Sequence, residues 1–190
     1  MSIVLASASP RRRELLSMLR VENFRVIPAA GEEIIEEGLS PAETVCALSR
    51  AKADEVSKQC LASDIIIAAD TIVVLDGDIL GKPSDKDDAL RMLTLLSGRA
   101  HSVFTGVTVM QGERVFTEFE RTLVRFREIT EKEIEAYIET DEPMDKAGSY
   151  GAQGIGSLFI EGIEGDFFNV MGLPLCKLSE MLGKLGVYLI

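Results

Sequence analysis

The chain begins with an apolar stretch that passes directly into a capped helix start. Residues 2–6, SIVLA, are short and rich in β-branched side chains, which predicts a buried strand. Ser9 and Pro10 then occupy the N-cap and first positions expected of a helix, and leucines follow at helical spacing. A strand that leads into a helix is the repeating unit of α/β proteins, so this opening favours that class.

The rest of the chain mixes such units with hairpins. A capping box at Ser40 predicts a second helix, and the strand DIIIAAD is expected to end on Asp70. An Asp-Gly pair at residues 76–77 predicts a hairpin turn, and residues 101–126 favour antiparallel pairing. Residues 157–175 predict two short strands around a turn. We therefore expect a mixed α/β fold in one domain over residues 1–190, since no linker divides the chain.

Composition excludes several classes of protein. The chain has 190 residues and a formal net charge of -11, which disfavours nucleic-acid polymers because binding to them depends on accumulated Lys and Arg. No apolar stretch approaches the length of a membrane-spanning helix, and the first residues lack the order of a secretory signal. We expect a cytoplasmic protein that binds no membrane. The 3 cysteines occur in no CxxC spacing, which favours free thiols.

Three consecutive arginines fall in the first turn of the helix predicted after Pro10. The helix dipole favours anions at that end, so these cations carry an electrostatic cost that a bound anion would remove. Orphan backbone N–H groups and guanidinium groups would then converge on one phosphate chain. A solvated basic face is the alternative interpretation.

Asp70 and two lysines are further candidates for chemistry. A carboxylate at a strand end could ligate a hard cation or accept a proton from water, or it could simply cap a turn. Lys52 and Lys82 could bind phosphate or lie in solvent, and GDILGKPS lacks the spacing of a P-loop.

Gln153 lies in the glycine-rich stretch DKAGSYGAQGIG, residues 145–156. Glycines suit a backbone that approaches a ligand closely. The Gln153 amide offers one acceptor and two donors, which can pair with the N3–H and O4 edge of uracil or thymine. A flexible surface loop is the alternative interpretation. The single histidine, His101, is expected to pack in the core or at a strand end.

Five segments, in order along nearly the whole chain, resemble the Maf family of nucleoside triphosphate pyrophosphatases. They are LASASPRRREL, AADTIVVLDGDILGKPSD, LSGRAHSVFTGV, YIETDEPMDKAGSYGAQG and IEGDFFNVMGLPL. The resemblance implies an elongated mixed sheet flanked by helices, with two lobes and a central cleft, of the inosine-triphosphatase-like type. It implies hydrolysis between the alpha and beta phosphates, a divalent metal (Mg or Mn) as cofactor, nucleoside triphosphates as substrates, and a homodimer.

The resemblance also implies roles for residues of this chain. They are Asp70 as the catalytic base; Glu33 and Asp70 as metal ligands; Ser7, Arg11, Arg12, Lys52 and Lys82 as substrate-binding residues; and Arg11, Thr71 and Gln153 as specificity residues. Arg13 lies outside the matching positions and is expected to be a solvated neighbour.

Gln153 favours the branch of the family that acts on dTTP and UTP. An amide can accept from N3–H and donate to O4, whereas the carboxylate of a sister branch suits guanine. Modified pyrimidine nucleotides are further candidate substrates, with a role in keeping them out of nucleic acids and in cell-division arrest. The alternative is a nucleotide-binding regulator of septation with little catalysis. The carboxylates argue against it, because without a metal they would repel phosphates.

Overall fold

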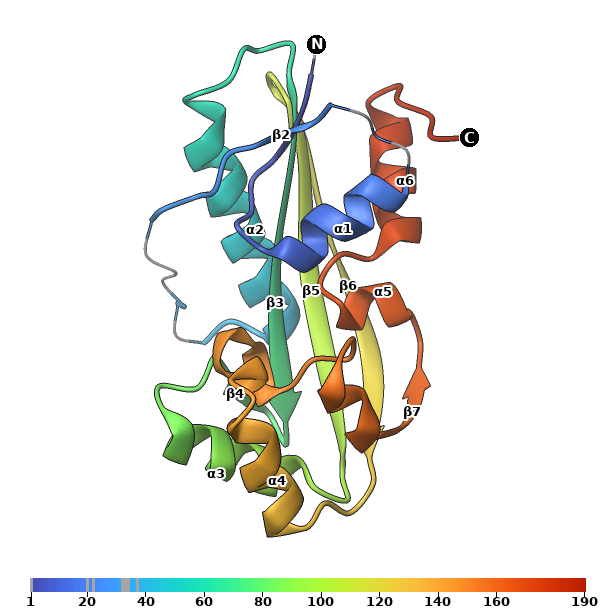
Figure 1. Ribbon diagram of the computed structural model, residues 1–190. Coiled ribbons are helices and arrows are strands. Elements are labelled where there is room, and N and C mark those ends of the chain that lie inside the picture. Colours follow the sequence, from blue (N-terminus) through green and yellow to red (C-terminus); the bar gives the residue numbers. More distant parts are fainter. Residues whose placement is uncertain (1, 20, 22, 32–34, 37) are drawn as a thin grey trace. The chain divides into compact units, whose positions relative to one another are not determined.

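The computed structural model describes residues 2–19, 21, 23–31, 35–36 and 38–190. Within these residues, seven strands form one mixed sheet flanked by helices (Figure 1). This arrangement confirms the predicted mixed α/β class. None of the described helices has both the length and the apolar character needed to span a membrane.

Two compact units can be distinguished along the chain. The first unit comprises Met1–Asp70, Thr105–Glu120 and Gly172–Ile190, and the second comprises Thr71–Phe104 and Arg121–Met171. Three long strands contribute residues to both units; they are β3 (Ile65–Leu75), β5 (Ala100–Gln111) and β6 (Arg114–Phe126). The single domain expected over residues 1–190 stays a prediction.

In the first unit, β1 (Ile3–Leu5) lies parallel to both of its neighbours. These are β2 (Arg25–Val26) on one side and β3 on the other. The helices of this unit are α1 (Pro10–Met18), α2 (Pro41–Ser57) and α6 (Leu175–Lys184). A buried cluster joins the strands to α2; it consists of Val4, Ala6, Ala53, Val56, Ile66, Ala68 and Met110.

Helix α2 begins where the sequence predicts. The Ser40 hydroxyl accepts from the Glu43 N–H at 3.3 Å, and the Glu43 carboxylate accepts from the Ser40 N–H at 2.9 Å, which completes the capping box. The helix lies close to β5 because Gly106 has no side chain: a Cβ there would lie 2.1 Å from the Val45 carbonyl oxygen. This close approach fixes the position of α2 on the first unit's part of the sheet.

In the second unit, β4 (Asp78–Leu80) pairs antiparallel with β3, and β7 (Ile160–Glu164) pairs antiparallel with β6. The predicted Asp-Gly turn is confirmed, with φ of 53° at Asp76 and 96° at Gly77. The helices of this unit are α3 (Lys86–Leu96), α4 (Glu131–Ile138), α5 (Phe167–Val170) and the 3₁₀ helices η1 (Glu142–Asp145), η2 (Ala147–Ser149) and η3 (Ile155–Phe159).

Two predictions about strands are wrong. Asp70 does not end a strand but lies inside β3, which continues to Leu75. No Gly, Pro or Asn separates Asp70 from the β-branched residues that follow it, so nothing interrupts the extended chain before the Asp76 turn. The second strand expected within residues 157–175 is instead helix α5, which begins because the Asp166 carboxylate accepts from the Phe168 N–H at 2.7 Å.

Candidate active site

The start of α1 is held by hydrogen bonds among Ser7, Ser9 and Arg12. Ser9 is the N-cap, and its hydroxyl accepts from the Arg12 N–H at 3.5 Å. Ser7, which is 7% exposed, accepts from the Ser9 N–H at 3.2 Å and from the Arg12 guanidinium at 3.3 Å. Arg12 Nε also donates to the Gly172 carbonyl at 2.7 Å. The guanidinium of Arg12 is thereby fixed beside Ser7 at the positive end of the helix dipole.

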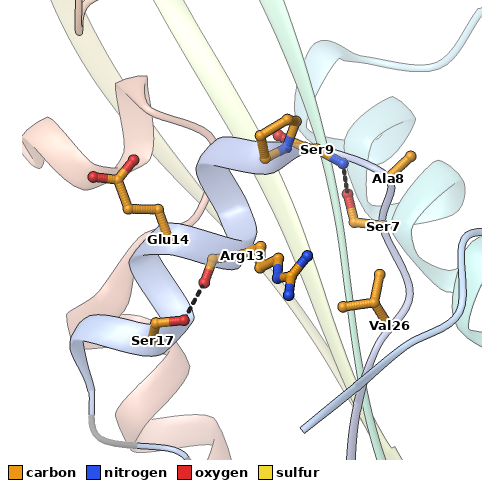
Figure 2. A pocket seen from close by; sticks show the side chains of 8 residues that line it. Ser7, Ala8, Ser9, Arg13, Glu14, Ser17 and Val26 are labelled. Atoms are coloured by element: carbon orange, nitrogen blue, oxygen red, sulfur yellow. Dashed lines mark hydrogen bonds between the residues drawn. The ribbon is translucent and has the colours of Figure 1, made fainter.

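An open pocket of about 420 Å³ lies beside this helix start. Ser7, Ser9, Arg13 and Val26 are among the residues that line it, and Figure 2 shows the Arg13 side chain extending from α1 toward Val26. The sequence analysis expects Arg13 to be a solvated neighbour of Arg11 and Arg12. Because Arg13 lines the pocket, it is a further candidate cation for an anion bound there.

Lys52 and Asp70 form an ion pair inside the first unit. The Lys52 ammonium donates to Asp70 Oδ1, and the two side chains are 17% and 7% exposed. A buried carboxylate needs such a partner, because isolated burial of a charge is strongly unfavourable. Asp70 Oδ2 makes no hydrogen bond with the described residues. The pair joins two residues that the sequence analysis considers separately: Lys52 lies on α2 and Asp70 lies on β3, so no local pattern reveals the contact.

Glu55 holds the chain segment that precedes the predicted metal ligand Glu33. Its carboxylate accepts from the Ala30 N–H at 2.8 Å and from the Gly31 N–H at 3.1 Å. These hydrogen bonds lower the pKa of Glu55. Glu33 itself lies outside the described residues. The sequence analysis does not single out Glu55; its place one helical turn after Lys52 is the only local signal.

Of the predicted site residues, Thr71, Lys82 and Gln153 belong to the second unit, and the segments that carry them meet there. The Gly148 N–H donates to the Gly81 carbonyl at 3.0 Å, which joins the stretch before Lys82 to the loop that contains Gln153. A Cβ on Gly148, where φ is 67°, would lie 2.9 Å from the Val73 side chain on β3. Lys82 and Gln153 are both exposed.

The first unit therefore brings together Ser7 with Arg12 and Lys52 with Asp70, whereas Arg11 has no hydrogen bond or ion pair with the site residues that the structure describes. Within the described residues, no group of three or more His, Cys, Asp or Glu side chains gathers to hold a metal ion. Asp70 is the one predicted metal ligand that the structure describes.

His101 is buried, as the sequence predicts. It is 2% exposed, and its Nε2 lies 2.7 Å from the Tyr150 hydroxyl. Its ring packs edge-on against Phe126 at 4.9 Å and against Tyr150 at 5.3 Å between centroids. Burial lowers the pKa of His101 to about 4, so the ring is neutral near pH 7.

A mixed α/β sheet, an arginine-bearing helix start and a buried carboxylate paired with lysine together have the character of an enzyme that acts on phosphorylated substrates. The family model described as Maf-like protein matches residues 2–185, and the chain belongs to this family. The resemblance seen in the sequence is thereby confirmed.

Several curated relatives match the chain over nearly its full length. A dTTP/UTP pyrophosphatase of Moorella thermoacetica is 50% identical and is aligned over 97% of this chain and 95% of the relative. A dTTP/UTP pyrophosphatase of Agathobacter rectalis is 48% identical, over 97% of this chain and 98% of the relative. Among solved structures, the chain is similar to a HAM1 protein from Coxiella burnetii with a TM-score of 0.44 and 18% identity, over 66% of this chain and 73% of that one.

Proposed function

We propose that this protein hydrolyses dTTP and UTP to the nucleoside monophosphate and diphosphate. The observation that carries the proposal is near-full-length similarity, at 50% identity, to a relative named dTTP/UTP pyrophosphatase. The hydrogen-bonded start of α1 and the buried ion pair of Lys52 and Asp70 support it, because they supply cations for a phosphate chain and a carboxylate for proton transfer.

A divalent cation, Mg or Mn, fits the donors that the chain offers. Asp70 is a hard oxygen ligand whose Oδ2 makes no hydrogen bond with the described residues. Mg²⁺ is commonly held by one or two carboxylates together with substrate phosphates, so it does not need a large cluster of acidic side chains. Asp70 and Glu33 would hold the cation. When bound, it would neutralise part of the charge on the phosphates.

In the proposed reaction, water attacks the alpha phosphorus and the diphosphate leaves. Asp70 accepts the proton of the attacking water, and Lys52 keeps the carboxylate in place through its bond to Oδ1. Ser7, Arg11 and Arg12 bind the triphosphate at the start of α1, where backbone N–H groups add to the positive potential. Stabilisation of charge on the leaving group is the main contribution of these cations.

The predicted site residues of the second unit are proposed to bind the nucleotide as well. Lys82 binds phosphate, and Thr71 and Gln153, with Arg11, select the base. The amide of Gln153 accepts from N3–H and donates to O4 of uracil or thymine. A pocket built to satisfy those hydrogen bonds discriminates strongly against a base with the opposite donor pattern.

Several finer assignments belong to the same proposal. We infer a homodimer and a cytoplasmic location, with removal of modified pyrimidine nucleotides and cell-division arrest as physiological roles. The alternative, a regulator of septation with little catalysis, predicts tight UTP binding without diphosphate release.

A diphosphate-release screen tests the proposal. We expect release from dTTP and UTP that exceeds release from GTP and methylated GTP, and that depends on added Mg²⁺. Preference for guanine nucleotides would contradict the assignment of Gln153. UTP binding with no diphosphate release over hours would favour the regulator.

A further inference from the structure

The carboxylate of Glu142 organises the loop that carries Gln153. Its Oε2 accepts from the Ile155 N–H at 3.0 Å, and its Oε1 accepts from the Gly156 N–H at 3.1 Å and from the Tyr137 hydroxyl at 2.9 Å. Glu142 opens η1, 11 positions before Gln153 in the sequence. Three donors on one carboxylate are enough to fix its orientation and to hold the backbone just after Gln153.

Tyr137 holds the other side of the same loop. Its hydroxyl accepts from the Gly151 N–H at 3.1 Å while it donates to Glu142, and the side chain is only 2% exposed. The backbone is therefore tied two residues before Gln153 and again two and three residues after it. The hydrogen bonds on both sides of Gln153 are made with the same two side chains, Tyr137 and Glu142, so these side chains hold the loop on both sides.

The glycines of this loop allow it to lie close to neighbouring side chains. A Cβ on Gly154 would lie 2.8 Å from a Glu142 carboxylate oxygen, and a Cβ on Gly156 would lie 2.6 Å from the Tyr137 hydroxyl. A Cβ on Gly151 would lie 2.9 Å from Lys146. The sequence analysis assigns the glycines to the close approach of a ligand. At these three positions the close approach is to side chains of the protein itself, which leaves the exposed Gln153 side chain outside the tied backbone.

Glu142 remains charged in this setting. Burial acts to raise its pKa, but the hydrogen bonds from Ile155, Gly156 and Tyr137 together outweigh burial, and the pKa lies below the ordinary value of 4.5. Lys146 is nearby: its ammonium donates to the Glu142 main-chain carbonyl and to Asp145 Oδ1, the latter at 2.6 Å. A charged acceptor makes stronger hydrogen bonds to the two amides than a neutral one.

We propose that Glu142 is a positioning residue for base selection, which fixes the backbone on both sides of Gln153 through Tyr137 and its own carboxylate. This inference rests on the proposed function, because Gln153 selects the base only if the substrate is a pyrimidine nucleoside triphosphate. Glu142 touches neither the phosphates nor the reacting water in this scheme. Its replacement should weaken recognition of the base and leave the phosphoryl chemistry largely unchanged.

The test compares kcat and KM for UTP and GTP in wild type and in Glu142→Ala. If Gln153 is no longer held in place, its hydrogen bonds to the base weaken equally in the ground state and in the transition state. KM for UTP should therefore rise with little change in kcat. We expect the UTP-to-GTP ratio of kcat/KM to fall by about tenfold or more, since misplacement by about 1 Å can cost that much. Glu135→Ala, an exposed change on α4, is the matched control and should leave the ratio unchanged.

Two further variants separate positioning from general damage. In a Gln153→Ala background, Glu142→Ala should lower the ratio no further, because the group that it positions is gone. Glu142→Gln keeps one acceptor but places an amide N–H against a backbone N–H. It should therefore give an intermediate UTP-to-GTP ratio of kcat/KM, and it replaces Glu142→Ala in the test if the alanine variant does not fold. Amide exchange at Ile155 and Gly156 should speed up in both Glu142 variants.

The outcomes distinguish this inference from the proposed function. Wild-type protein that releases no diphosphate from any triphosphate overturns the function, and the inference with it. Wild-type activity with an unchanged UTP-to-GTP ratio in the Glu142 variants overturns the inference alone. A fall in kcat equal for both nucleotides also overturns it, because that result would place Glu142 in the phosphoryl chemistry or in general stability.

Discussion

Acidification should destabilise this protein through His101 before most carboxylates are protonated. The ring is 2% exposed, and Nδ1 has no hydrogen-bond partner among the described residues. Protonation would give both ring nitrogens an N–H. Nε2 could donate to the Tyr150 hydroxyl, 2.7 Å away, but the second N–H would be buried with no acceptor among the described residues. The charged ring is therefore strongly disfavoured in the folded state.

The size of the effect follows from the shift in pKa. Burial lowers the pKa of His101 from 6.5 to about 4, so between these values the unfolded chain binds more protons than the folded one. The stabilisation is fully present above pH 6.5 and is lost as the pH falls toward 4. At 1.36 kcal/mol per pKa unit, folding stability should fall by about 3 kcal/mol across this window from His101 alone.

Urea denaturation of wild type and His101→Gln at several values between pH 7 and pH 4 measures this contribution. The carboxylates are common to both proteins, so the difference between their pH profiles isolates the histidine. We expect the stability of wild type to fall by about 3 kcal/mol more than that of the variant over this range. Parallel profiles would refute the reasoning, because they would show that His101 titrates equally in the folded and unfolded states.

Three other changes test the packing and the helix start. Lys52→Met leaves the buried Asp70 carboxylate without its cation and should lower the free energy of unfolding by about 3–5 kcal/mol in urea titrations, with most of the loss recovered when Asp70→Asn is added. Gly106→Ala places a Cβ against a carbonyl of α2 and should cost about 1–3 kcal/mol, visible as a lower thermal midpoint at unchanged net charge. Arg12→Ala should reduce UTP turnover far more than Arg13→Ala in diphosphate-release assays, and equal losses would point to a generic basic surface.

Local signals in the sequence predict much of the fold. The capping box at Ser40 predicts the start of α2, because the side chains that satisfy the backbone are close to it in sequence, and the Asp-Gly pair predicts the turn at Asp76. Helix α5 is missed because four residues carry no periodicity, and only the Asp166 cap marks it.

The site is less visible from the sequence, because its contacts are long-range. The pairing of Lys52 with Asp70 depends on how α2 lies on the sheet. That position depends on Gly106 of β5, which is far from both residues in the sequence. Placing Asp70 at a strand end fails for a different, local reason: an Asp after an apolar run resembles a strand exit, but no Gly, Pro or Asn interrupts the β-branched residues that follow it. The contacts of Glu142 with the loop around Gln153 likewise match no residue spacing that could be recognised in the sequence.

The role of Asp70 is the central claim, and one comparison tests it most directly. Diphosphate release from dTTP in the presence of Mg²⁺ is measured for wild type, Asp70→Asn and the control Asp54→Asn, a change at a half-exposed position on α2 that leaves the ion pair of Lys52 and Asp70 intact. Loss of the general base should lower kcat by about 10²–10⁴-fold in Asp70→Asn, with no comparable loss in the control. Near-normal turnover by folded Asp70→Asn would contradict the account.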